Sequence, residues 1–192
     1  MKRYTAGPFA TNCYLDGSIL IDTPPGSFDL IKDPITHILL THSHWDHTAD
    51  LSKFLEKFPN VVIASHPDDI GNIKNPGSDG LPLMFAIEGV EPTLLVREGD
   101  VIEGLQVIDL PGHTPGGVGY YDPKRKILFS GDTLFQGTIG NLSFPTARPD
   151  LMWKSLKKLA KLPPDTLVLP GHGDPTTIGA EDWLDRAEQV FG

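Results

Sequence analysis

The chain has 192 residues, 39% of them hydrophobic, which is enough to bury one core of ordinary size. Its formal net charge of −9 argues against a general nucleic-acid binder, because neutralising phosphates requires clustered Lys and Arg. No apolar run approaches the roughly 20 residues that span a bilayer, and the first residues lack the apolar stretch of a signal peptide. We therefore expect a single-domain cytoplasmic protein that acts on a small molecule and binds neither nucleic acid nor membrane.

Short β-like runs alternate with amphipathic stretches along the chain. The runs predicted as strands are Ile19 to Asp22, Ile35 to Leu40, Val61 to Ala64, Leu94 to Val96, Leu105 to Leu110, Gly119 to Tyr121, Ile127 to Phe129 and Leu167 to Leu169. Apolar residues recur at helical spacing after Asp46, after Asp150 as a predicted N-cap, and from Glu181 to Phe191. The lone cysteine, Cys13, excludes an intramolecular disulfide, and its apolar neighbours favour a buried thiol.

The order of these elements favours an α+β fold. From Leu94 to Phe129 strands follow one another without helices, which fits antiparallel hairpins better than a doubly wound sheet. Two packed sheets flanked by helices are the natural architecture. The segment from Asn75 to Phe85 is rich in Gly and Pro and is predicted to be a loop. Its apolar part, Leu81 to Phe85, could form a substrate wall or pack on its own domain, and we favour packing.

The strongest chemical signal is the motif THSHWDH, which follows the apolar run Ile38 to Leu40. Residues two apart in an extended segment project to the same side, so His42 and His44 can grip one metal ion. Asp46 and His47 turn into the next helix and could face a second ion. Three histidines and an aspartate at this spacing make a specific metal-binding pattern.

Three later sites share one arrangement, in which an apolar strand ends at a polar residue flanked by glycine. They are LPGHT with His113, LFSGDT with Asp132 and LPGHG with His172. Glycine allows a sharp turn and leaves room beside a metal, while the preceding strand fixes the direction of the side chain. Each alone could be an ordinary turn, but together with THSHWDH they indicate one site.

These motifs, in this order, closely resemble the metallo-β-lactamase superfamily and, within it, the glyoxalase II-like (hydroxyacylglutathione hydrolase-like) hydrolases. The resemblance runs from TNCYL through LIDTPP, THSHWDH, PGHTPG and SGDTLFQGTIG to PGHG. It implies a four-layer αββα sandwich with the site at one edge between its halves. It also implies that His42, His44 and His113 hold a first metal, that Asp46, His47 and His172 hold a second, and that Asp132 bridges both.

The resemblance implies a metal-dependent hydrolase, in which two cations make hydroxide from a shared water for attack on an acyl carbon. Asp46 and Asp132 are the expected catalytic carboxylates, with Asp46 orienting the hydroxide and later accepting a proton. True β-lactamases commonly have a cysteine at the position of Asp132. Zinc is the first expectation for the metals, and iron or manganese are alternatives because histidine and carboxylate ligands accept all three.

Small thioesters are the substrates that the resemblance favours. A lactonase, a phosphodiesterase or a sulfur dioxygenase of the same fold, or a non-catalytic metal-binding regulatory module, are the alternatives. Glyoxalase II enzymes carry an extra C-terminal helical domain that forms much of the glutathione site, whereas this chain stops 20 residues after His172. We therefore expect that domain to be absent and glutathione not to be strongly required.

Three further polar residues have weaker claims to a role in the site. Asp22, in LIDTPP, could cap a helix or orient a ligand imidazole, and the sequence favours neither. His37 and His66 follow or lie within predicted strands, and we interpret both as structural.

Overall fold

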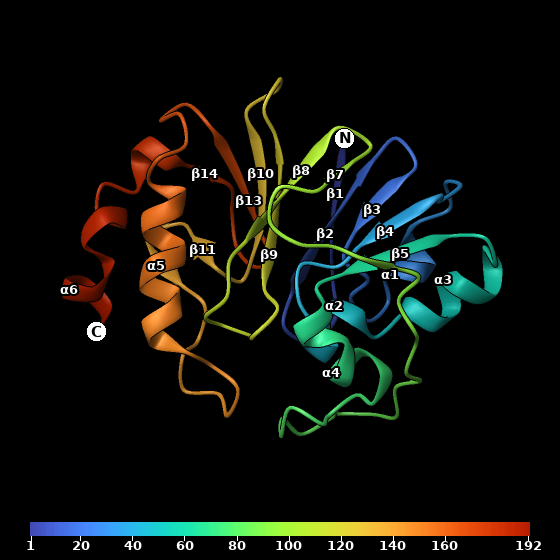
Figure 1. Cartoon of the computed structure of the whole chain (residues 1–192). Helices are drawn as coiled ribbons and strands as arrows, with labels where there is room; N and C mark the ends of the chain where they lie inside the picture. Colours follow the sequence, from blue (N-terminus) through green and yellow to red (C-terminus); the bar gives the residue numbers. More distant parts are fainter.

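The computed structural model describes all 192 residues, and it has two six-stranded sheets packed face to face (Figure 1). The first sheet contains, in spatial order, β1 (Lys2–Ala6), β2 (Thr11–Asp16), β3 (Ile19–Ile21), β4 (His37–Leu39), β5 (Val62–Ser65) and β6 (Leu94–Leu95). The second contains β14 (Thr176–Thr177), β13 (Leu167–Pro170), β10 (Ile127–Gly131), β9 (Val118–Asp122), β8 (Leu105–Asp109) and β7 (Val101–Ile102). A separate hairpin joins β11 (Leu134–Phe135) to β12 (Thr138–Ile139).

Helices lie on the outer side of each sheet (Figure 1). Beside the first sheet are α1 (Ser27–Leu30), α2 (Trp45–Thr48), α3 (Leu51–Lys57) and α4 (Ile70–Lys74). Beside the second are α5 (Pro149–Leu159) and α6 (Ala187–Phe191). Three short 3₁₀ turns cover Pro67–Asp69, Ile178–Ala180 and Leu184–Arg186. None of the helices combines the length and the apolar character required to cross a bilayer.

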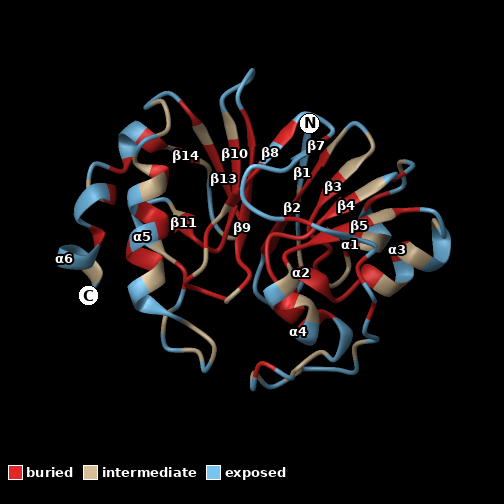
Figure 2. Ribbon diagram, in the orientation of Figure 1, coloured by how far each residue is buried: buried red, intermediate tan, exposed pale blue.

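Both faces of the central strands are buried, because each sheet packs on its partner and on helices (Figure 2). In β3 and β4, Leu20 and Ile38 point outward to Phe54 of α3, whereas the alternate residues Ile21 and Leu39 point inward to the second sheet. Such strands read as continuous apolar runs in the sequence. The expected four-layer αββα sandwich of the α+β class is confirmed.

All eight predicted strands are present, but the run from Leu94 to Phe129 does not stay in one sheet. β6 pairs in parallel with β5 in the first sheet, and only the later strands, from β7 onward, form antiparallel hairpins. The sequence prediction missed the N-terminal hairpin β1–β2, in which β1 is mostly exposed. The segment from Asn75 to Phe85 is a loop, and Cys13 is fully buried.

Two predicted helix boundaries are wrong. Arg148 and not Asp150 occupies the N-cap position of α5, because Pro149, which has no N–H to lose, fits the first turn. The predicted helix from Glu181 to Phe191 is divided into a 3₁₀ turn and the short α6. No helix starts at Glu181, because its backbone is non-helical (φ −98°, ψ 69°) where it ends the preceding 3₁₀ turn.

The two sheets are joined by hydrogen bonds at the ends of their strands. The Tyr120 hydroxyl of the second sheet donates to the Leu40 carbonyl at 2.9 Å, and the Tyr14 hydroxyl of the first donates to the Pro170 carbonyl at 2.8 Å. Both carbonyls lie within two residues of a predicted metal ligand, His42 or His172. The same bonds that join the sheets therefore fix the loops that carry the chemical motifs.

We predict that Tyr120→Phe lowers the free energy of unfolding by about 1–2 kcal/mol, because the buried Leu40 carbonyl loses a donor while the ring still fills its place. Tyr4→Phe is the matched control. The Tyr4 hydroxyl makes no hydrogen bond in the structure, and its ring packs on the apolar cluster between the first sheet and α3. Urea denaturation of the three proteins measures both values. Equal losses in the two variants would contradict the inter-sheet role of Tyr120.

Candidate metal centre

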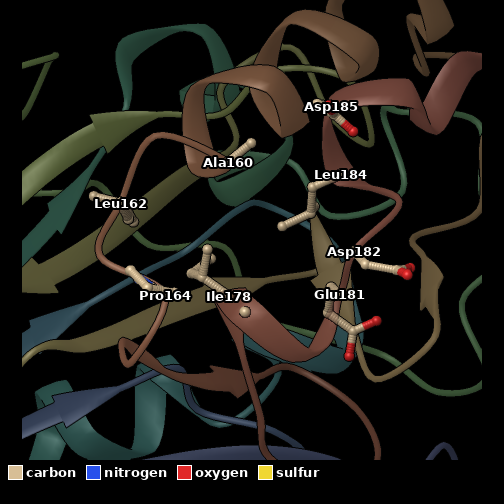
Figure 3. A pocket seen from close by; sticks show the side chains of 9 residues that line it. Ala160, Leu162, Pro164, Ile178, Glu181, Asp182, Leu184 and Asp185 are labelled. Atoms are coloured by element: carbon tan, nitrogen blue, oxygen red, sulfur yellow. The ribbon is translucent and has the colours of Figure 1, made fainter.

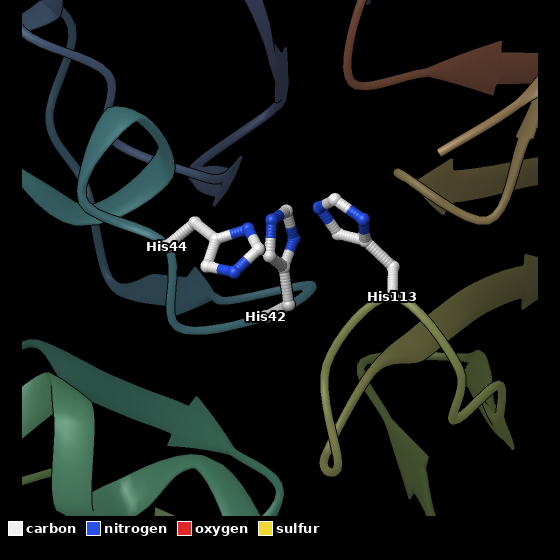
Figure 4. A group of neighbouring side chains, drawn as sticks. All are labelled: His42, His44 and His113. Atoms are coloured by element: carbon white, nitrogen blue, oxygen red, sulfur yellow. The ribbon is translucent and has the colours of Figure 1, made fainter. Parts of the chain in front are cut away.

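The seven histidine and aspartate residues singled out by the sequence come from four strand ends. His42 and His44 lie just after β4, and Asp46 and His47 belong to α2, which follows at once. The other three residues come from the second sheet and lie in the loop after β8 (His113), directly after β10 (Asp132) and shortly after β13 (His172). Figure 4 shows His42 and His44 on one loop with His113 approaching from another.

The structure brings these residues together in three overlapping groups. The nitrogen or oxygen atoms of each group lie within 4.8 Å of one another. The groups are His42, His44 and His113; His42, His47 and Asp132; and Asp46, His47 and His172. The first and third have the composition expected for the two metals, and the middle group places Asp132 between them.

Asp132 is the centre of the cluster and is 9% exposed. Its Oδ1 lies 3.3 Å from Nε2 of His47, and its Oδ2 lies 3.4 Å from Nε2 of His113 and 3.4 Å from Nε2 of His172. One carboxylate thus reaches imidazoles of both outer groups, which is the position that a bridging ligand needs.

Four buried polar atoms of the cluster have no hydrogen-bond partner: Nε2 of His42, His44 and His113, and Oδ1 of Asp132. A buried polar atom without a partner costs about 1–3 kcal/mol, so four at one place need an explanation. A shared cation would provide one, and nitrogen and carboxylate oxygen are donors that Zn, Fe and Mn accept. The residues present therefore fit a pair of divalent ions.

The opposite nitrogens of three rings are held by the surrounding chain. Nδ1 of His113 lies 2.9 Å from the Asn141 carbonyl oxygen, and Nδ1 of His172 lies 3.1 Å from that of Phe9. A carbonyl can only accept, so each Nδ1 carries a proton and each Nε2 faces the cluster. His47 is held in the same way, with Nδ1 2.9 Å from Oδ2 of Asp22.

Asp22 orients the imidazole of His47, a predicted metal ligand, and does not cap a helix. Its carboxylate accepts from His47 and from both the amide and the hydroxyl of Thr41 at 2.8 Å. The residue is 2% exposed and has a φ of 60°, a backbone conformation that few non-glycine residues adopt. Helix α1 instead begins after Gly26. The choice that the sequence left open is settled by this contact.

Electrostatics differ between the two outer groups. Burial lowers the pKa of His42 well below its usual value and that of His44 to about 3, so both are neutral, as metal ligands must be. Burial acts in the same direction on His47 and His172, but the carboxylates of Asp132 and Asp46 outweigh it. They raise the pKa of His47 well above its usual value and that of His172 to about 9. A cation entering the second group therefore has to displace a proton.

Glycine is needed where the motif strands end. A Cβ on Gly171 would lie 2.2 Å from Oδ1 of Asp132 and 2.6 Å from the His47 ring. Gly131 has a φ of +50°, and a Cβ there would meet the Thr41 side chain at 2.7 Å. Glycine therefore leaves room beside the cluster at Gly171, whereas at Gly131 it allows the sharp turn and the close approach of Thr41.

Asp69 is a site residue that the sequence analysis missed. Its carboxylate is 3% exposed and accepts from the Ser43 amide and the Thr114 hydroxyl at 2.8 Å, and from the Gly116 amide at 2.7 Å. It thereby ties the loop of His42 and His44 to the loop of His113. The pair Asp68–Asp69 looks like an ordinary helix start in the sequence, so no local pattern marks this role.

His37 and His66 lie outside the cluster, as the sequence analysis expected. His37 is within 3.9 Å of Glu103 at the surface. Nδ1 of His66 accepts a hydrogen bond from the Asp68 amide and caps a 3₁₀ turn. Both residues have structural partners.

Two hollows of similar size differ in their chemistry. One of about 300 Å³ is lined by five of the seven cluster residues: His44, Asp46, His113, Asp132 and His172. The other, of about 280 Å³, lies between the end of α5 and the C-terminal segment (Figure 3). Its buried carboxylate, Glu181, is fully engaged by Thr176, the Gly137 amide and Trp183. Only the first hollow therefore offers unpartnered polar atoms to a ligand.

We predict that Asp69→Asn weakens metal binding by the group of His42, His44 and His113 by about tenfold to a hundredfold. Three donors converge on the carboxylate, and an amide has one accepting oxygen, so its NH₂ group would face a donor. Asp68→Asn is the control, because the Asp68 side chain is 61% exposed. Competition with a chromophoric chelator measures both affinities, and unchanged binding by Asp69→Asn would contradict the role of Asp69.

Comparison with known proteins identifies the family. Residues 6–172 match the Metallo-beta-lactamase superfamily. Hydroxyacylglutathione hydrolase GloC of Haemophilus influenzae is 32% identical over 75% of this chain and 71% of its own length. The crystal structure of TTHA1623 in a di-iron-bound form superposes with a TM-score of 0.82 over 94% of this chain and 96% of that one. The sequence identity between the two chains is 37%. The crystal structure of the BLEG-1 B3 metallo-beta-lactamase is 32% identical, with a TM-score of 0.85 over 100% and 99% of the two chains. The chain therefore belongs to the metallo-β-lactamase superfamily.

Proposed function

We propose that the protein is a metal-dependent hydrolase of small thioesters. The observation that carries the proposal is the buried cluster in which two sets of three ligands share Asp132 and face one cavity. In this proposal His42, His44 and His113 hold one divalent ion, and Asp46, His47 and His172 hold the other. Asp132 would be the carboxylate shared between them. Zinc is the first choice of metal, and the di-iron form of TTHA1623 supports iron as the alternative.

When bound, two divalent ions acidify a water and polarise the acyl oxygen of a substrate. The chain supplies the proton path. Asp46 lines the cavity, and the Thr11 hydroxyl donates to its Oδ2 at 2.9 Å, which fixes the carboxylate. Asp46 takes up the proton released by the attacking water and can pass it to the leaving group. A thiolate needs little protonation to leave, which suits a site without a stronger acid.

The chain offers no protein nucleophile to replace water. Cys13 is fully buried in the first sheet, and burial raises the pKa of its thiol. Ser43, the serine of the THSHWDH motif, does not line the cavity, and its Oγ accepts from Nδ2 of Asn72 at 3.4 Å. These observations favour direct attack by water over hydrolysis through a covalent intermediate.

The names of relatives support two substrate classes. GloC is a hydroxyacylglutathione hydrolase, and its substrate is a thioester. A carboxylate at position 132 favours that branch over the β-lactamases that have cysteine there. β-Lactam hydrolysis is the second candidate, because BLEG-1 is a B3 metallo-beta-lactamase that matches the whole chain at 32% identity.

We predict metal-dependent hydrolysis of thioesters with at most about tenfold preference for glutathione as the thiol. The cavity has no Lys or Arg to hold the carboxylates of glutathione. The measurement compares kcat/KM for a glutathione ester and an N-acetylcysteamine ester of the same acyl group, with Zn, Fe or Mn added. Chelated protein and Asp132→Asn should be inactive on both.

A preference for glutathione of a hundredfold or more would contradict the weak glutathione requirement. Absence of thioester hydrolysis with all three metals would overturn the thioesterase proposal. Hydrolysis of a cephalosporin by the same preparations would then favour the second candidate.

A further inference from the structure

The cavity that contains the cluster is apolar wherever it is not made of cluster residues. Eleven residues line it, and five of them belong to the cluster. The other six are Phe9, Trp45, Leu81, Phe135, Asn141 and Phe144. Five of these are hydrophobic, the sixth is a neutral amide, and none is charged. A ligand that enters would therefore meet aromatic and aliphatic walls whose polar groups, the Asn141 amide and the Trp45 indole N–H, are neutral.

The aromatic walls reach the cluster itself from both sides. The centroid of the Phe144 ring lies 5.3 Å from the centroid of the His44 ring and 5.6 Å from that of the His113 ring. On the other side, the centroids of the Phe135 and His172 rings are 5.9 Å apart. Groups attached directly to a reacting carbon at the cluster would contact these rings, so the apolar character applies to the part of the substrate next to the reacting bond.

The loop that supplies Leu81 is held in place beside the cavity. Oδ1 of Asp79 accepts from the Leu81 amide at 3.0 Å, and Oδ2 accepts from Nδ2 of Asn72 at 2.8 Å. Asn72 also donates to the Ser43 carbonyl, between the two histidines of the motif. The loop is thus held on its own domain, as the sequence analysis favoured, and it also brings Leu81 to the cavity. Leu81 is a wall of the cavity, and its position is tied to the metal-ligand loop.

Cations adjacent in sequence to the lining segments are directed elsewhere. Arg148, four residues beyond Phe144, pairs with Asp150. Arg3 pairs with Asp174, beyond His172. None of the six lining residues outside the cluster is a cation, so an anionic substituent beside them would lose water without gaining an ion pair, which is unfavourable. A neutral apolar substituent would gain from the loss of water.

From this lining we infer that the cavity selects thioesters whose acyl group is neutral and apolar and rejects acyl groups that carry a carboxylate. The inference rests on the proposed thioesterase function and names its substrate class. A volume of about 300 Å³ is at the lower limit of pockets for small ligands, so the acyl group is short, of the size of a branched alkyl chain or a phenyl ring.

The test compares two N-acetylcysteamine thioesters, 5-methylhexanoyl and glutaryl. The terminal isopropyl and carboxylate groups match in shape, so charge is the main difference. We expect kcat/KM for the 5-methylhexanoyl ester to be about a hundredfold higher, after subtraction of the uncatalysed rates, which corresponds to about 2.7 kcal/mol. Equal values, or a preference for glutaryl, would overturn the inference.

A charge introduced into the wall should change the preference in a defined way. Leu81→Lys places a cation in the cavity and should reduce the preference for 5-methylhexanoyl at least tenfold, mainly by raising kcat/KM for glutaryl. Leu81→Met keeps the wall apolar and should retain the preference. If both variants behave alike, Leu81 does not contact the acyl group and the inference is wrong.

Binding separates failure of the inference from failure of the proposed function. Ketone analogues, in which a methylene replaces the thioester sulfur, cannot be cleaved by hydrolysis and can be measured by calorimetry on the metal-loaded protein. We expect the 5-methylhexanoyl ketone to bind at least tenfold more tightly than the glutaryl ketone. This preference without cleavage of any thioester would refute thioesterase activity and keep the inference about the cavity. Binding of neither ketone would overturn the inference.

Discussion

The buried carboxylate of Asp132 is the constraint on which the rest of the site depends. Burial alone would raise its pKa, but the imidazoles of His47 and His172 hold that pKa well below its usual range, so the group stays charged. No Lys or Arg reaches it, and its Oδ1 has no hydrogen-bond partner. A charged group in this position is tolerable only with a counter-charge. Protonated His47 and His172 supply that charge, and divalent ions held by the cluster would supply it in their place.

The sequence predicted the site better than it predicted the chain around it. THSHWDH and the three glycine-flanked residues could be found because each follows an apolar strand that fixes its direction, and the structure brings all seven together. Asp69 and Leu81 could not be found in this way. The role of Asp69 depends on contacts with residues 26 or more positions away, of which Ser43 is the nearest in sequence. The role of Leu81 depends on how a loop without hydrophobic periodicity folds. The N-terminal hairpin was missed because β1 is mostly exposed and has no apolar run.

The same contacts that build the fold also set the chemistry. Tyr120 and Tyr14 join the two sheets next to the loops that carry His42 and His172. Asp22, which follows β3 of the first sheet, holds the imidazole of His47. The rings of Phe135 and Phe144 pack on ligand imidazoles and form the walls of the cavity. In the proposed function, metal binding and substrate selection would therefore depend on some of the same side chains.

The central claim is that one cluster binds two metal ions around Asp132. Anomalous diffraction from crystals of the metal-loaded protein, measured at the absorption edge of the metal, tests it most directly. The account predicts two peaks about 3.5–4 Å apart, one beside His42, His44 and His113 and the other beside Asp46, His47 and His172, with Asp132 between them. A single peak at full metal loading, or peaks away from these residues, would contradict it.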